Sequence, residues 1–171
     1  MQKILATINK AMKCKIGIDF HGVINTRPLF FRLFCQTALN KNMDVYIISG
    51  GPYETINTYL KQYKIPYTKL WCIYDYYEKK GQITYFADGS FRVADELWNK
   101  AKAEYCRREN ICVHIDDSTI YGQTFATPYC LYDDKENICE INGHKIILDN
   151  PEDALQQIMK YCRFVPVVSG Y

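Results

Sequence analysis

The sequence predicts a mixed α/β fold, with a doubly wound, mainly parallel sheet and helices on both faces. Short apolar runs recur along the chain and are continuous rather than alternating, which is typical of strands covered on both sides. Longer helical patterns lie between these runs, as in repeated βαβ units. The 171 residues, 48% of them apolar, suffice for one buried core and are few for two. We therefore predict a single domain over residues 1–171.

Predicted strands and helices alternate along the chain. The strands are 15–19 (KIGID), 44–49 (DVYIIS), 111–116 (ICVHID) and 127–132 (TPYCLY), with 69–74 (KLWCIY) as a fifth candidate. The helices are 27–42, 52–64, 95–110 and 150–162. Proline begins three of these helices, where its missing N–H costs little, and Asp95 is the expected N-cap of the remaining one. An Asn-Gly pair between two apolar stretches predicts a β-hairpin within 135–148.

Composition and charge narrow the classes of function. A net charge of +2 gives no general attraction to nucleic acid or anionic membranes. Residues 1–13 have apolar side chains at helical spacing but no signal-peptide features, and no apolar run is long enough to span a membrane. The eight cysteines form no CxxC pair, which favours buried free thiols in a reducing cytoplasm. We expect a cytoplasmic protein without a membrane partner.

Polar side chains stand where the predicted strands end. Asp19 ends the first strand, Ser49 the second, and Asp116 and Asp117 end the strand over 111–116. Because parallel strands end at the same edge of a sheet, we expect these side chains to converge there. Three crowded carboxylates need a counter-charge, and a hard divalent cation such as Mg²⁺, which prefers oxygen ligands, supplies it.

The order of these residues resembles that of the haloacid dehalogenase superfamily of aspartate-nucleophile phosphohydrolases. The resemblance rests on IGIDFHGVI, YIISGG, KAEYC and VHIDDS, which span residues 16–118. It implies that Asp19 attacks phosphorus and forms an aspartyl-phosphate, while Ser49 holds the phosphoryl oxygens. Lys102 is the implied charge-neutralising lysine, with Lys100 as the alternative.

The same resemblance implies a metal site and a substrate site. Mg²⁺ would be bound by Asp19, the backbone carbonyl of His21, Asp116 and Asp117. The candidate substrate-binding residues are Phe20, Gly22, Gly50 and Lys100. The two glycines allow the backbone to approach the phosphate closely.

The chain departs from the family's phosphatase pattern at His21. That position usually holds an aspartate, which protonates the leaving oxygen and then activates water. Imidazole has an ordinary pKa of about 6.5 and is able to do the same proton transfers, so we expect this role for His21. In the alternative interpretation His21 only lines the pocket and turnover is slow. His114, in the middle of a strand, is expected to be a packed core residue.

Insert lengths bear on the substrate. One helix fills the interval between Asp19 and Ser49, so no cap domain fits there. Residues 77–93 remain as a loop or small hairpin, a minimal cap at most, and an open site suits a nucleotide or another small phosphorylated substrate. Two alternatives stay open: a catalytically weak or inactive phosphate-binding protein, and a phosphatase acting on nucleic-acid ends. The near-neutral charge argues against the latter.

Overall fold

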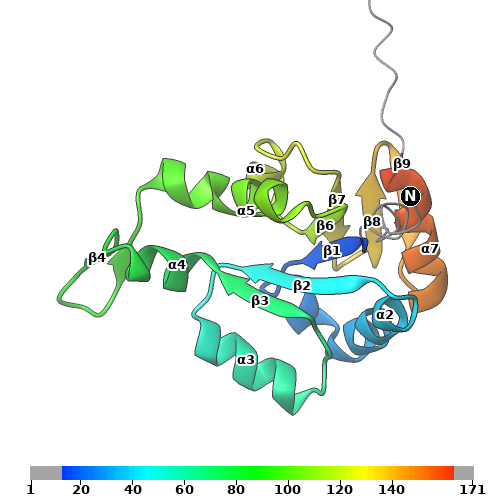
Figure 1. The fold of residues 1–171 in the computed structure, drawn as a ribbon, viewed down its shortest axis with the longest axis horizontal. Coiled ribbons are helices and arrows are strands. Elements are labelled where there is room, and N and C mark those ends of the chain that lie inside the picture. Colours follow the sequence, from blue (N-terminus) through cyan, green and yellow to red (C-terminus); the bar gives the residue numbers. More distant parts are fainter. Residues whose placement is uncertain (1–12, 164–171) are drawn as a thin grey trace, which may run out of the picture.

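A seven-stranded, mostly parallel sheet forms the centre of the protein in a computed structural model that describes residues 13–163 (Figure 1). The expected helical pattern within 1–13 lies almost entirely outside the described residues. The strand order is β3-β2-β1-β6-β7-β8-β9. The first five in this order are parallel, and the last two are antiparallel additions at one edge. No helix within 13–163 is long and apolar enough to cross a membrane.

The strands follow the predicted apolar runs closely. Their bounds are β1 Lys15–Ile18, β2 Asp44–Ser49, β3 Lys69–Cys72, β6 Val113–Asp116, β7 Tyr129–Asp133, β8 Ile138–Ile141 and β9 His144–Ile147. The central strands are buried on both faces, as their continuous hydrophobicity predicts. Ile18 of β1 is in register with Ile47 of β2 and with Ile115 of β6. The residues that follow on β1 and β6 therefore reach the same edge of the sheet.

Helices cover both faces of the sheet, α2, α3 and α7 on one and α5 on the other (Figure 1). Their bounds are α2 Pro28–Asn40, α3 Tyr53–Gln62, α5 Asp95–Glu109 and α7 Pro151–Cys162. The side chain of Asn150 caps α7 by accepting hydrogen bonds from two backbone N–H groups. The expected cap of α5 is wrong by one residue: Ala94 is the N-cap, and Asp95 is already helical and pairs with Arg92.

Two local elements differ from the prediction. The run 69–74 is a strand only to Cys72, and α4 Ile73–Lys79 begins at once. The backbone N–H of Tyr74 donates to Gly50, and Asp75 accepts from the N–H of Tyr53, so contacts with the end of β2 favour a turn there over further strand. A short helix, α6 Thr119–Gly122, follows β6 and is capped by Ser118.

Two hairpins accompany the sheet. Residues 77–93 contain the end of α4 and a small antiparallel pair, β4 Thr84–Tyr85 and β5 Phe91–Arg92, which projects from the body of the molecule (Figure 1). Within 135–148, β8 and β9 pair around Asn142 and Gly143, both of which have positive φ. A single-turn 3₁₀ helix, Ile24–Thr26, joins β1 to α2. All eight cysteines lie in the described residues and are free.

Candidate functional site

A hollow of about 400 Å³ opens at the carboxyl edge of the parallel strands. Its walls come from the ends of β1 and β2, from α5 and from the start of α6. The lining residues are Asp19, His21, Gly22, Ser49, Gly50, Trp98, Lys102, Asp117, Ser118 and Tyr121. Asp116 lies directly behind it and is fully buried. The side chains at the four strand-end positions therefore meet at one place, although they are distant in sequence.

Asp19 presents one fixed oxygen and one free oxygen. Its Oδ1 accepts the backbone N–H of Phe20 at 2.7 Å and lies 3.0 Å from the ammonium of Lys102. Its Oδ2 has no hydrogen-bond partner among residues 13–163. The side chain is only 5% exposed, so the carboxylate keeps one orientation. A carboxylate held in this way can direct its free oxygen at an electrophile in the hollow.

Lys102 is the cation between two carboxylates. Its Nζ lies 3.0 Å from Asp19 Oδ1 and 2.7 Å from Asp116 Oδ2, and the side chain is 2% exposed. Burial acts to lower the pKa of Lys102, but the two carboxylates outweigh it and hold this pKa above its ordinary value. The ammonium therefore stays charged, and its charge is shared between the two acids.

Asp116 is held from three sides. Its Oδ2 faces Lys102 and lies 3.0 Å from Nε2 of His114, while its Oδ1 accepts the backbone N–H of Ser118 at 3.0 Å. Burial acts to raise the pKa of Asp116, but the hydrogen bond to His114 and the charge of Lys102 bring it well below its usual range. Asp116 is therefore an ionised carboxylate in a fixed position.

His114 is the buried core residue that its position in the strand predicts, but it also contacts the site. Its ring stacks on Phe125 with centroids 5.1 Å apart. Among residues 13–163, Nδ1 has no hydrogen-bond partner, and it faces Gly17, where a Cβ would lie 2.6 Å from it. Because Asp116 is an acceptor, the proton belongs on Nε2. Residues two apart on a strand share a face, and this spacing was the sequence signal for the contact between His114 and Asp116.

The acidic cluster fits a divalent cation that prefers oxygen ligands. Oxygens of Asp19, Asp116 and Asp117 lie within 4.8 Å of one another. The side chain of Asp117 lines the hollow. Its partial burial, and to a lesser degree the charges of Asp19 and Asp116, raise its pKa. Such crowding disfavours three ionised carboxylates unless a cation joins them. Gly22, with a φ of +79°, allows this arrangement, because a Cβ there would collide with the carboxylate of Asp117.

His21 and Ser49 line the hollow next to each other. Ser49 is fully buried, and its Oγ is 3.3 Å from Nδ1 of His21. The imidazole is exposed and packs edge-on against Phe20, with ring centroids 4.9 Å apart. A hydroxyl, an imidazole and the backbone at Gly50 therefore line the same hollow as the carboxylate of Asp19.

Two candidate residues lie away from the hollow. Lys100 is exposed, and its ammonium lies 2.7 Å from Glu96. Residues two apart on a helix differ by more than half a turn, so Lys100 points outward when Lys102 points toward the sheet. The side chain of Phe20 is buried and packs edge-on against Tyr59 in the core. Neither side chain is therefore among those that line the hollow, and the backbone N–H of Phe20 donates to Asp19.

Three lining residues were not predicted. Trp98 lies one turn before Lys102 on α5, and this i,i+4 spacing is the signal that could have identified it. Ser118 and Tyr121 follow the acidic pair directly, within the cap and first turn of α6. The indole N–H of Trp98 donates to the hydroxyl of Tyr121 at 2.9 Å, so these two side chains hold each other in place.

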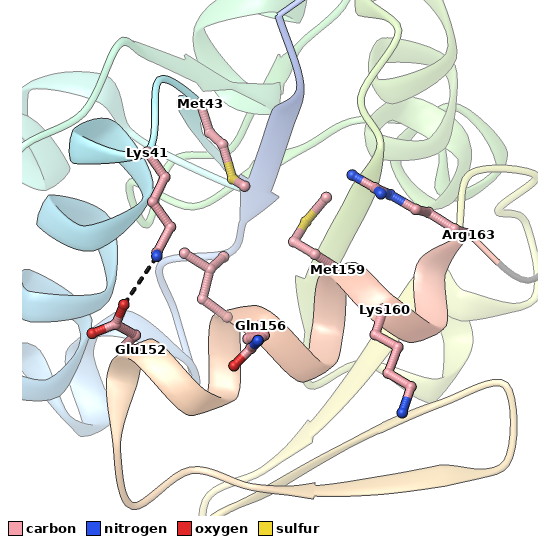
Figure 2. A pocket seen from close by; sticks show the side chains of 8 residues that line it. Lys41, Met43, Glu152, Gln156, Met159, Lys160 and Arg163 are labelled. Carbon is pink, nitrogen blue, oxygen red and sulfur yellow. Dashed lines mark ion pairs between the residues drawn. The ribbon is translucent and has the colours of Figure 1, made fainter.

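A larger hollow, of about 570 Å³, lies at the opposite edge of the sheet, between α7 and the end of α2. Figure 2 shows its lining, with the ion pair between Lys41 and Glu152, 2.9 Å apart, and the side chain of Met159. Its described lining residues include no cluster of carboxylates and no nucleophile with a fixed orientation. Its location at the amino edge also separates it from the carboxyl ends of the parallel strands, where sites form in such folds.

No family model, curated protein or solved structure matches this chain. The resemblance to the haloacid dehalogenase superfamily therefore rests on the residues and on their arrangement in the fold. What is established is a mixed α/β protein with a mostly parallel central sheet and a cluster of three acids, one lysine, one histidine and one serine at its carboxyl edge.

Proposed function

We propose that the protein is a phosphomonoester hydrolase of the haloacid dehalogenase type that depends on Mg²⁺ and acts through an aspartyl-phosphate. The observation that carries this proposal is the orientation of Asp19. Lys102 and the N–H of Phe20 hold one oxygen, the other has no hydrogen-bond partner among residues 13–163, and the carboxylate lies within 4.8 Å of oxygens of Asp116 and Asp117. An aspartate that only paired with a buried lysine would not require Asp116 and Asp117 at the same place.

The residues of the hollow support a two-step reaction. Asp19 Oδ2 forms a bond to phosphorus, and the bond from phosphorus to the leaving oxygen breaks as protonated His21 gives that oxygen a proton. Neutral His21 then takes a proton from water as the water oxygen attacks the phosphoryl group. The bond between Asp19 and phosphorus breaks, which releases inorganic phosphate and restores the carboxylate.

The other side chains bind charge. Ser49 and the backbone at Gly50 can donate to the phosphoryl oxygens, while Lys102 offsets the charge of Asp19 and of the transferring group. Asp19, Asp116, Asp117 and the backbone carbonyl of His21 would hold the metal. When bound, Mg²⁺ would supply electrostatic stabilisation of the phosphoryl oxygens.

Phosphate release tests the proposal. We expect the chain to release phosphate from an aryl phosphate and from members of a panel of nucleotides and sugar phosphates, with Mg²⁺ and not with chelator. Asp19→Asn should abolish release, whereas Asp149→Asn, at an exposed acid outside the hollow, should not. Absence of release in the wild-type protein would refute the proposal, and binding of Mg²⁺ and phosphate analogues without release would identify a phosphate-binding protein instead.

His21 has a separate test. His21→Ala should lower the rate of release and change its dependence on pH, because the variant lacks the group that is proposed to transfer the proton. His144→Ala, at an exposed histidine on β9, is the matched control. If His21→Ala left both the rate and the pH profile unchanged, the proton-transfer role would be wrong while the role of Asp19 would stand.

A further inference from the structure

Exposed apolar side chains gather on elements that adjoin the hollow or its lining residues. Eight large hydrophobic residues of the described chain are exposed, and five of them belong to the β4–β5 hairpin, the start of α5 or α6: Tyr85, Phe86, Phe91, Leu97 and Ile120. Figure 1 shows the hairpin projecting beyond the body of the molecule next to the start of α5. Apolar groups that cluster in one exposed area mark a binding surface more often than scattered ones do.

Aromatic rings connect this surface to the site. Trp98 lines the hollow, and its ring centroid is 6.0 Å from that of Phe91, which in turn is 4.8 Å from that of Tyr74. We call these three side chains the aromatic rim. The hydroxyl of Tyr74 is 3.1 Å from that of Tyr85, which ties the hairpin to α4. A continuous set of rings therefore runs from the wall of the hollow to the tip of the hairpin.

The aromatic rim is held in place before any ligand binds. The indole N–H of Trp98 donates to Tyr121, and a Cβ on Gly50 would lie only 3.2 Å from the indole ring. Trp98 therefore lies directly beside the backbone that is proposed to hold the phosphate. A planar group attached to that phosphate can contact the aromatic rim with little loss of side-chain entropy on the protein.

Charges near the aromatic rim indicate how many phosphates the ligand carries. Arg92 lies 3.6 Å from Asp95, and Lys100 lies 2.7 Å from Glu96, so each of these two cations is paired with an acid, while Lys79 and Lys80 are exposed at the end of α4. A polyphosphate or a nucleic-acid backbone requires clustered cations along its path. Among the described residues, Lys102 is the one lysine or arginine that lines the hollow, which suits one phosphate there and an uncharged flat body on the aromatic rim.

We propose that the substrate is a nucleoside monophosphate whose base stacks on the aromatic rim, with Phe91 and Trp98 as specificity-determining residues. The inference rests on the proposed phosphatase function and specifies its substrate. Stacking uses the π-face that every base has, so the preference among bases is expected to be weak. The preference for a base over a non-aromatic leaving group is expected to be strong.

Kinetics provide the first test. In Phe91→Leu, which keeps an apolar side chain but removes the ring, kcat/KM for adenosine monophosphate should fall about tenfold. For glycerol 3-phosphate, which has no ring, it should stay within about twofold of wild type, because the phosphate chemistry is untouched. Tyr161→Leu removes a ring that stacks on His144 at the far edge of the sheet, and it should change neither value. Equal losses for both substrates in Phe91→Leu would overturn the proposal.

Binding without turnover provides the second test and separates the two proposals. In Asp19→Asn with Mg²⁺, adenosine monophosphate should quench the tryptophan fluorescence, and Phe91→Leu in that background should weaken binding about tenfold.

Quenching without hydrolysis by the wild-type protein would refute the phosphatase and leave the aromatic rim as a nucleotide site. Hydrolysis without a preference for nucleotides would refute the aromatic rim alone. Tighter binding of phosphotyrosine than of adenosine monophosphate would overturn the assignment to a nucleobase, and absence of both binding and hydrolysis would overturn both proposals.

Discussion

Replacing Lys102 with methionine is the substitution whose effect follows most directly from the structure. The side chain is 2% exposed and lies between Asp19 and Asp116, at 3.0 and 2.7 Å. Methionine fills a similar volume but carries no charge. The variant therefore leaves two carboxylates facing each other in a buried place, with His114 and the backbone N–H of Ser118 as the remaining donors to Asp116.

The expected cost is large. Removal of one partner from a buried ion pair costs about 3–5 kcal/mol, because an uncompensated charge stays buried. For a chain of this size that corresponds to a loss on the order of 10 °C in Tm. Mg²⁺ should restore part of this loss in Lys102→Met, since a cation among Asp19, Asp116 and Asp117 supplies the missing counter-charge. The gain in Tm on addition of Mg²⁺ should therefore be larger in the variant than in the wild-type protein.

Urea unfolding at neutral pH, with chelator and with Mg²⁺, measures both effects. Lys100→Met is the matched control, because it removes the same group two positions away on the same helix, where the ammonium is exposed and pairs with Glu96. We expect no measurable change in its unfolding. If the two variants lost equal stability, or if Mg²⁺ left Lys102→Met unaffected, both the buried ion pair and the proposed cation site would be wrong.

Three further changes have defined outcomes. His114→Leu removes a hydrogen-bond donor from Asp116 and should weaken Mn²⁺ binding by about 10–100-fold, as measured by electron paramagnetic resonance. Unchanged affinity would mean that His114 only packs in the core. Gly22→Ala should lower the free energy of unfolding by about 1–2 kcal/mol and also weaken Mn²⁺ binding, because the new Cβ meets Asp117. Gly143→Ala, at a similar φ of +77° with open space around it, should lower stability without changing Mn²⁺ binding. Because the folded-state pKa of Asp116 is held below its unfolded value of about 3.9, its stabilisation is present above that value and is lost as the pH falls from there toward the folded-state pKa. Urea unfolding of Asp116→Asn in chelator should therefore show a shallower loss of stability below about pH 4 than the wild-type protein, and parallel slopes would contradict the reasoning.

The regular elements were predictable because local pattern and tertiary environment agree for them. The run over 44–49 is continuously apolar, and β2 is buried on both faces, so the pattern and its physical cause coincide. Asn142 and Gly143 adopt positive φ as their residue types favour. For 69–74 the two disagree: the apolar character of Ile73 reflects burial in a helix, and short apolar runs do not distinguish a buried helix from a strand.

The site was predictable only in part. Strand ends identify Asp19, Ser49, Asp116 and Asp117, because parallel topology brings such ends to one edge. Spacing alone left Lys100 and Lys102 as alternatives, and the helix rotation that separates them depends on which face of α5 packs on the sheet. A local pattern cannot specify that face when both positions carry the same residue.

By itself, the sequence determined the alternation of buried strands and helices and the placement of carboxylates at strand ends, since both follow from residue type and from periodicity along the chain. Only the tertiary structure decided which oxygen of Asp19 is free, which lysine is buried, and that Trp98 and Phe91 adjoin the hollow. These facts depend on distances between residues that are far apart in sequence, and such distances are set by the packing of whole elements.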